Sequence, residues 1–137
     1  MSSEDSSSVR SRDIIRQFNK YIFNPIILAL VRRGKGPFSA VRHKGRCSDR
    51  EYTTPVLATY IGNDIIVPLS YGEHVDWLRN VQARGSCEIH WKREVMVAVD
   101  PRIIDAETAL LMLPDDRRAL FQRFDVDKFL LLRRQIN

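Results

Sequence analysis

The chain has 137 residues, of which 44% are hydrophobic and 28% are charged. A chain of this length forms one domain without needing disulfides or a structural metal, and its composition excludes wholesale disorder, collagen-like repeats and a polytopic membrane protein. The net charge of +5 arises between Arg32 and Tyr52, where seven basic residues stand against two acidic ones. This local cluster indicates an anionic partner: a phosphate-bearing ligand, nucleic acid or an anionic membrane surface.

The start of the chain predicts a tail followed by one domain. Residues 1–10 are rich in serine and acidic residues, which predicts disorder, and the domain is expected over residues 11–137. No secretory signal is expected, and the apolar run Ile26–Val31 is too short to span a membrane, so we expect a cytoplasmic protein. Cys47 and Cys87 indicate free thiols in a reducing compartment, although a single bridge stays possible.

The first half of the chain predicts helices and then strands. Apolar residues at helical spacing predict a helix from Arg12, and Asn24-Pro25 predicts the start of a second short helix that ends near Arg33. Two runs, Phe38–Arg42 and Thr53–Ile61, are typical of strands. Gly62-Asn63-Asp64 predicts a hairpin turn that leads into a return strand at Ile65–Ser70.

The second half predicts a helix, a hairpin and helices. A helix is expected over His74–Arg84, with Gly85 as its stop. A hairpin is expected from Cys87–Trp91 and Glu94–Val99, turning at Lys92-Arg93. The remaining expected elements are a strand at Arg102–Ile104, a helix capped by Asp105 through Met112, a helix starting at Pro114 and a helix over Val126–Arg134 capped by Asp125. Hairpin-linked strands favour an antiparallel sheet in a small barrel with helices outside, of the α+β class.

The loop from His43 to Pro55 is the first segment that could carry chemistry. Gly45 permits backbone geometry that other residues resist. Free backbone N–H groups, together with Lys44, Arg46 and Ser48, are suited to binding a phosphate. A solvated basic loop is the alternative, and the Walker pattern Gly-x-x-x-x-Gly-Lys is absent.

The second such segment is Pro68–Asn80. Trp77 and Asn80 are three residues apart and share a helix face. Trp77 could lie against a planar ring and Asn80 could bond a loop backbone; alternatively, Trp77 packs in the core and Asn80 is on the surface. The three histidines lack metal-ligand spacing, so no metal site is expected, and nucleic-acid binding has no support beyond charge.

Together the two segments resemble the deazaflavin (F420)-dependent nitroreductase family, whose members are small split β-barrel proteins, many of which use reduced coenzyme F420. The resemblance extends over roughly residues 15–134. The residues that match the family pattern are His43, Gly45, Arg46, Ser48, Tyr52, Thr54, Pro55, Tyr71, Gly72, Asp76, Trp77 and Asn80.

The resemblance implies a split antiparallel barrel with an N-terminal helix, one inserted helix and C-terminal helices. It implies hydride transfer from reduced F420, in preference to FMN, to a quinone-like or nitroaromatic acceptor. Tyr71 or Ser70 is expected to hydrogen-bond or protonate the reduced acceptor. The residues expected to bind the cofactor are Lys44, Gly45, Arg46, Ser48, Tyr52, Pro55, Ser70, Trp77 and Asn80.

Two positions depart from the family pattern. Asp49 stands where the family usually has glycine, and Cys47 stands where a basic residue is frequent. A carboxylate beside an anionic ligand is repelled by about 4 kcal/mol at about 4 Å if the effective dielectric constant is about 20. Neighbouring cations could offset this repulsion, or Asp49 could turn outward.

Two other functions stay open on the sequence alone. One is a non-catalytic binder of a flavin, haem or lipid in the same barrel, and the other is an interaction protein with a degenerate cofactor loop. A homodimer is a further possibility. The N-terminal helix, with Arg12, Arg16 and Lys20, either packs on the barrel or lies on a membrane surface.

Overall fold

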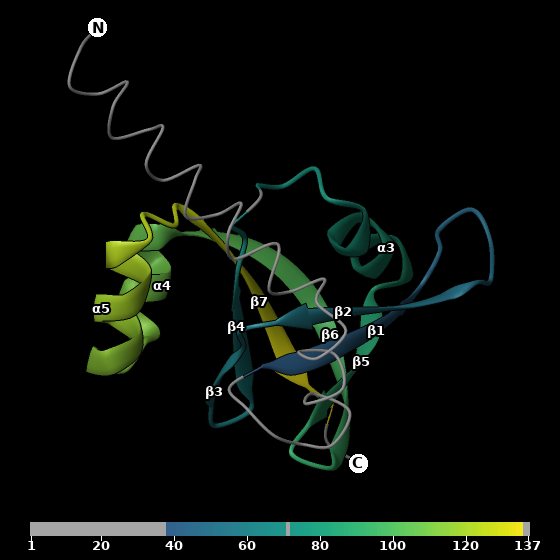
Figure 1. Ribbon diagram of the computed structural model, residues 1–137, viewed down its shortest axis with the longest axis horizontal. Helices are drawn as coiled ribbons and strands as arrows, with labels where there is room; N and C mark the ends of the chain where they lie inside the picture. The colour runs from purple at the N-terminus through teal and green to yellow at the C-terminus, as the bar shows by residue number, and fades with distance from the viewer. Residues whose placement is uncertain (1–37, 71, 136–137) are drawn as a thin grey trace, which may run out of the picture.

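The computed structural model describes residues 38–70 and 72–135. The expected tail, the two expected helices before residue 38 and Tyr71 lie outside the described residues. In the described part, the strands form one antiparallel sheet of order β2-β1-β5-β6-β7-β4-β3 (Figure 1). The strands are β1 Ser39–Lys44, β2 Glu51–Val56, β3 Thr59–Ile61, β4 Asp64–Pro68, β5 Ser86–Trp91, β6 Glu94–Asp105 and β7 Lys128–Arg134. The helices are α3 Asp76–Arg84, α4 Ala106–Met112 and α5 Asp115–Arg123.

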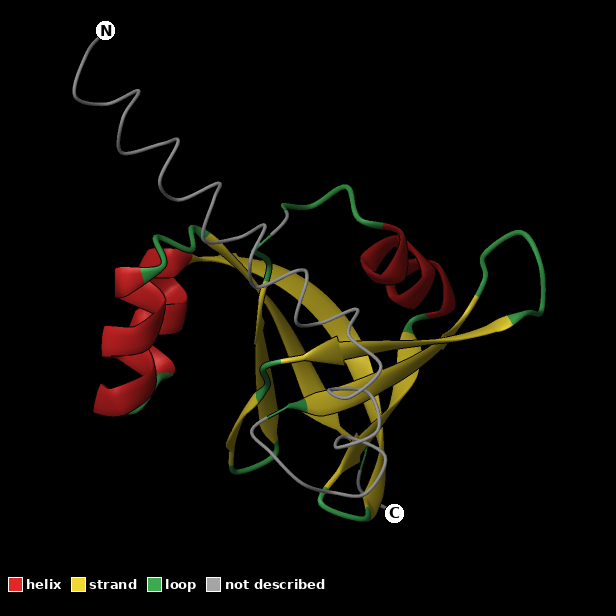
Figure 2. Cartoon of the chain, in the orientation of Figure 1, coloured by secondary structure: helices red, strands yellow, loops and turns green. Residues whose placement is uncertain are grey.

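The sheet curls into a half-closed barrel. Its two edge strands, β2 and β3, follow one another in the chain, and only Leu57 and Ala58 separate them. The three peptide steps from Val56 to Thr59 span at most about 11 Å, so the two edges lie close to each other. Figure 2 shows α3 on one side of the curled sheet and α4 with α5 on the other. This arrangement confirms the expected α+β split barrel.

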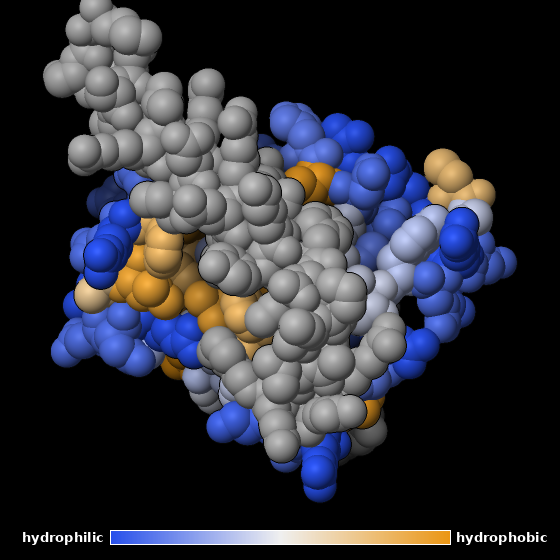
Figure 3. Space-filling model, viewed as in Figure 1, coloured by the Kyte–Doolittle hydropathy of each residue, from blue (hydrophilic) through white to orange (hydrophobic). Residues whose placement is uncertain are grey.

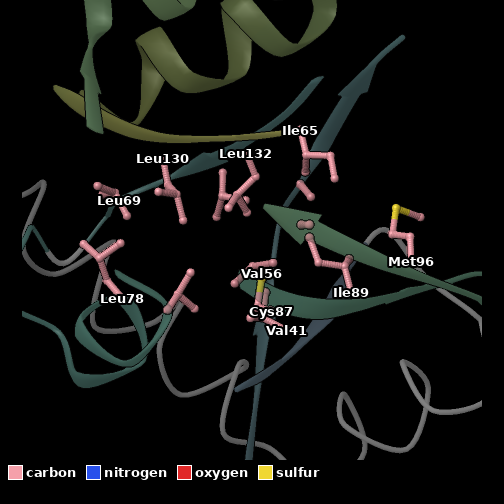
Figure 4. Close-up of a cluster of buried hydrophobic side chains, with 14 residues drawn as sticks. Val41, Val56, Ile65, Leu69, Leu78, Cys87, Ile89, Met96, Leu130 and Leu132 are labelled. Carbon is pink, nitrogen blue, oxygen red and sulfur yellow. The ribbon is translucent and has the colours of Figure 1, made fainter. Parts of the chain in front are cut away.

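Alternation along β4 and β7 divides the core into two clusters. Ile65, Leu130 and Leu132 belong to the cluster inside the barrel, together with Leu78 from α3 (Figure 4). Ile66 and Phe129 instead face a second cluster that includes residues of α4 and α5. Successive side chains of a strand point to opposite faces, so both strands are buried on both sides. Hydrophobic surface is visible beside α4 and α5 in Figure 3, bounded by hydrophilic residues.

Several expected boundaries are confirmed. Gly85 ends α3 with a left-handed φ of 74°, and its N–H donates to the Val81 carbonyl. Lys92 and Arg93 both have positive φ and turn the β5–β6 hairpin. Asp105 caps α4 by accepting from the Thr108 N–H, and α5 begins directly after Pro114.

Two expected elements are wrong, and a third is part of a longer strand. The helix over Val126–Arg134 is instead β7, inserted between β6 and β4. Thr53–Ile61 is divided between β2 and β3, because the chain passes from one edge of the sheet to the other. The expected strand at Arg102–Ile104 is confirmed, but it belongs to β6, which continues past an irregularity between Val99 and Arg102. No helix among the described residues is long and apolar enough to cross a membrane.

Candidate functional site

A cleft of about 750 Å³ lies between the β1–β2 loop, β2, the segment after β4 and α3. The two segments that the sequence indicated therefore form opposite walls of one site. The cofactor-binding residues predicted from the resemblance that line it are Gly45, Arg46, Ser48, Tyr52, Pro55, Ser70, Trp77 and Asn80. Lys44 lines a different groove of about 410 Å³ instead. Tyr71 is outside the described residues.

The β1–β2 loop folds back on itself at Gly45. The Gly45 N–H donates to the Arg50 carbonyl at 2.9 Å, which closes the loop. A Cβ at Gly45 would lie 2.8 Å from Ser48 Oγ and 3.2 Å from the Ser48 carbonyl oxygen. Glycine is therefore favoured here by the close approach of Ser48 rather than by an unusual φ.

Arg84 ties this loop to α3. Its Nη2 donates to the Gly45 carbonyl at 3.0 Å, to Asp49 Oδ1 at 3.1 Å and to the Ser48 carbonyl at 3.5 Å. This role of Arg84 was not predicted, because nothing in the local sequence indicates a contact with residues so distant in the chain. The side chain of Asp49 is 90% exposed, and Asp49 does not line the cleft.

Asn80 is the buried centre of the polar wall, with 4% of its surface exposed. Its Oδ1 accepts from the Arg46 backbone N–H at 3.1 Å and from Arg46 Nη1 at 2.9 Å. Its Nδ2 donates to His43 Nδ1 at 3.1 Å. The prediction that Asn80 bonds a loop backbone is confirmed, and the alternative of a surface Asn80 is wrong.

The guanidinium group of Arg46 bridges the loop and α3. Besides Asn80, it contacts Asp76, whose Oδ1 lies 3.3 Å from Arg46 Nη2. A guanidinium has five N–H donors, and the described residues engage two of them. Arg46 therefore keeps donors for a ligand in the cleft.

His43 also lines the cleft and is 6% exposed. Its Nε2 lies 3.0 Å from Thr54 Oγ1, and its ring stacks on Tyr52 at 5.7 Å between centroids. Burial holds the pKa of His43 below its usual value of 6.5, because burial penalises the charged imidazolium. His43 is therefore neutral near neutral pH.

The other end of the cleft is apolar. Trp77 is half-buried and packs against the barrel core, as one expectation has it, and it also lines the cleft. That Trp77 lies against a planar ring stays a prediction. Pro55, Leu69 and Val75 also line this end. Ser70 places a hydroxyl group among these apolar walls.

The two cysteines differ in reactivity. Both are free thiols; Cys47 is exposed and lines the cleft, whereas Cys87 is buried. Burial raises the pKa of Cys87 to about 12, which keeps it protonated and unreactive. Among the described residues, no group of three or more His, Cys, Asp or Glu side chains could hold a metal ion.

Comparison with models of protein families returned no match for this chain, and neither did comparison with curated proteins. Solved structures do share its fold. A candidate pyridoxamine 5′-phosphate oxidase from Listeria innocua is 7% identical, with a TM-score of 0.55 over 80% of this chain and 91% of that one. A structure described as an F420 reductase is 10% identical, with a TM-score of 0.50 over 79% and 92% of the two chains.

A third structure, described as a domain-swapped dimer, is 14% identical, with a TM-score of 0.51 over 88% of this chain and 98% of that one. Identities this low show a common fold. The chain therefore has the split-barrel fold of these proteins.

Proposed function

We propose that this protein is an F420-dependent oxidoreductase that transfers a hydride from reduced F420 to a quinone-like or nitroaromatic acceptor. The observation that carries this proposal is a cleft with one cationic, donor-rich end and one flat, apolar end. A fold in common with a structure described as an F420 reductase supports it. The cleft volume of about 750 Å³ is within the range of small-molecule and cofactor sites.

The polar end has a donor set that suits the phosphate and acidic tail of F420. Within the described residues, the backbone N–H groups of Cys47 and Ser48 donate no hydrogen bond. Cys47 and Ser48 line the cleft together with Arg46, and Gly45 allows the tight turn of this loop. Charge-assisted hydrogen bonds from such groups would hold an anion.

The apolar end suits a planar ring. Trp77 and Pro55 offer flat surfaces that would orient the ring and exclude water from it. The chemistry that F420 supplies when bound in reduced form is donation of a hydride, after which the two-electron reduction of the acceptor needs one more proton. We assign that proton, or a hydrogen bond to the acceptor oxygen, to Ser70, with Tyr71 as the alternative donor.

The proposed function includes a cytoplasmic location and a homodimer, the latter because one protein of this fold is described as a dimer. A lipophilic acceptor would reach the cleft from solution or from a membrane on which the N-terminal segment lies. These features do not alter the roles assigned to the cleft.

The direct test is titration of the purified protein with oxidised F420 and, separately, with FMN, followed by fluorescence or calorimetry. We expect F420 to bind more tightly than FMN because the loop offers several donors to an extended anionic tail. Reduced F420 should then be oxidised when a quinone or a nitroaromatic is added. Absent or equal binding of F420 would contradict the proposal, and FMN, haem or lipid binding without turnover would favour a non-catalytic binder.

A further inference from the structure

Three residues from three elements form a hydrogen-bonded chain along the polar wall of the cleft, and all three line the cleft. His43 lies on β1, Asn80 lies on α3, and Arg46 lies in the β1–β2 loop. The distances are 3.1 Å from His43 Nδ1 to Asn80 Nδ2, and 3.1 Å and 2.9 Å from Asn80 Oδ1 to the backbone nitrogen and Nη1 of Arg46. His43 and Asn80 are both buried.

The direction of each bond in this chain is fixed by chemistry. Both groups of Arg46 can only donate, so the carbonyl oxygen of Asn80 must face Arg46 and its NH₂ group must face His43. Because an NH₂ group only donates, His43 Nδ1 must accept. The imidazole is therefore neutral with its proton on Nε2, and this N–H donates to Thr54 Oγ1.

A proton added to His43 would break the chain. Nδ1–H would then face the NH₂ group of Asn80, which places two donors against each other. Turning the Asn80 amide over would satisfy His43 but would set the NH₂ group against the donors of Arg46. In the turned-over arrangement, which removes the clash at His43, Arg46 loses its buried acceptor and keeps only Asp76, whose side chain is 83% exposed.

We propose that His43 and Asn80 are positioning residues that hold Arg46 ready for an anionic ligand, and that protonation of His43 releases Arg46 and weakens ligand binding. The positioning chain itself is independent of the ligand, whereas the effect on binding rests on the proposed function. His43 is given no contact with the ligand in this proposal. It acts only through Asn80.

Protonation of His43 could also strengthen the binding of an anionic ligand, through the added positive charge. The direction in which binding changes with pH therefore distinguishes the two effects. Within the described residues, its ring nitrogens bond only Thr54 and Asn80, so no carboxylate holds a proton on the ring. An imidazolium would add a positive charge beside Arg46, which by itself would attract an anion. The titratable and charged groups that share a groove with His43 are Arg42, Lys44, Arg46, Cys47, Glu51, Tyr52, Asp76, Arg84, Cys87 and Glu88.

The ligand-free test is an NMR titration of the Arg46 backbone amide and the Asn80 side-chain amide from about pH 8 to about pH 5. We expect both signals to follow the titration of His43, with a midpoint below 6.5. They should lose this response in His43→Gln, which keeps a donor and an acceptor but does not titrate. His90→Gln is the matched control, because His90 pairs with Glu88 and does not line the cleft. If neither amide signal shifts as His43 titrates, the proposal that His43 and Asn80 position Arg46 is wrong.

The ligand test is calorimetric titration with F420 at the two ends of the same pH range. We expect wild-type binding to weaken by about threefold or more on acidification relative to His43→Gln. Titration of F420 itself contributes equally to both proteins and cancels in this comparison. The proposal is wrong if wild type binds F420 more tightly in acid. It is also wrong if the affinity of wild type changes with pH to the same extent as that of His43→Gln.

A second variant keeps the test decisive if His43→Gln folds poorly. In Asn80→Asp, a carboxylate oxygen would face His43 Nδ1 and could accept a hydrogen bond from it once the ring is protonated. Acidification should therefore no longer release Arg46. Unchanged acid weakening in Asn80→Asp would contradict the proposal. If F420 binds to no variant at any pH, the proposed function fails, and the NMR titration still decides whether His43 and Asn80 position Arg46.

Discussion

Arg46 is held by two partners that differ strongly in burial. Asn80 is 4% exposed, whereas the side chain of Asp76 is 83% exposed. An exposed ion pair contributes little, about 0–1 kcal/mol, so a ligand anion can replace Asp76 on the guanidinium at small cost. Asn80 keeps the guanidinium in place during that exchange.

Arg46→Ala should therefore weaken F420 binding by about 1.5–3 kcal/mol, the range for a hydrogen bond to a charged group. The melting temperature should change little, because the ion pair that is lost is exposed and Asn80 Oδ1 keeps its bond from the backbone N–H of residue 46. Parallel calorimetry and thermal melting measure the two effects. Arg79→Ala is the control, since it removes the same charge from a residue of α3 that does not line the cleft. If Arg46→Ala binds F420 as well as wild type does, the anion lies elsewhere.

For single residues, the sequence predicts which side chains share a face of α3, but it does not predict their contacts with residues distant in the chain. The three-residue spacing of Trp77 and Asn80 places both on one side of α3, and both line the cleft. The bond between Asn80 and His43 joins residues 37 apart in the chain, and Arg84 reaches Gly45 across 39. Sequence spacing shows neighbours on one element only, so the roles of His43 and Arg84 were visible only in the structure.

Among the elements, β7 shows most clearly where local sequence misleads. Leucine favours helices, and Asp125 is a residue type that commonly caps them. In the structure Asp125 has a left-handed φ of 56°, and the chain after it extends between β6 and β4. Phe129 and Leu130 face different core clusters, so the strand is apolar on both sides. A strand buried on both faces has no period-two pattern and cannot be distinguished from a buried helix by sequence.

Because β7 is central, Leu130→Ala should lower the free energy of unfolding by about 2–5 kcal/mol through lost burial and a residual cavity. Leu130 is fully buried and is paired with Val67 on one side and Ile103 on the other. Leu111→Ala is the matched control: the same atoms are removed from a residue that is 81% exposed, and the change should stay within about 0.5 kcal/mol. Denaturant unfolding of the three proteins measures both values. Equal losses in the two variants would contradict the central placement of β7.

For the whole molecule, hairpin-linked strands suffice to predict an antiparallel barrel with helices outside. They do not predict the pairing of β1 with β5 or of β4 with β7, which joins strands distant in the chain. That pairing places the basic loop opposite α3 and so forms the cleft. Arg46 and Arg50 of the β1–β2 loop thereby form a positive region, and this loop lies on the side of the molecule away from α5 (Figure 1).

Asp49 modifies that positive region from outside the cleft. Its carboxylate pairs with Arg84 rather than lining the site, so any repulsion of the ligand acts at a distance through solvent. Asp49→Gly should strengthen F420 binding at low ionic strength, since it removes the acidic partner of Arg84 and so leaves more net positive charge in the same region. The gain should vanish in high salt, because the screening length falls from about 30 Å at 0.01 M to about 3 Å at 1 M.

Loop mobility opposes this gain. A glycine at position 49 adds freedom to the free loop, which can cost up to about 1 kcal/mol on binding, but the Gly45 and Ser48 carbonyls remain bonded to Arg84 and limit that cost. Calorimetric titrations of wild type and Asp49→Gly at low and high salt separate the two effects. Asp125→Gly is the control, because it removes the same charge at the end of α5, where a φ of 56° suits glycine. Weaker binding of Asp49→Gly at both salt concentrations would mean that the bond from Asp49 to Arg84 is needed to order the loop, and that its electrostatic effect on the ligand is the smaller one.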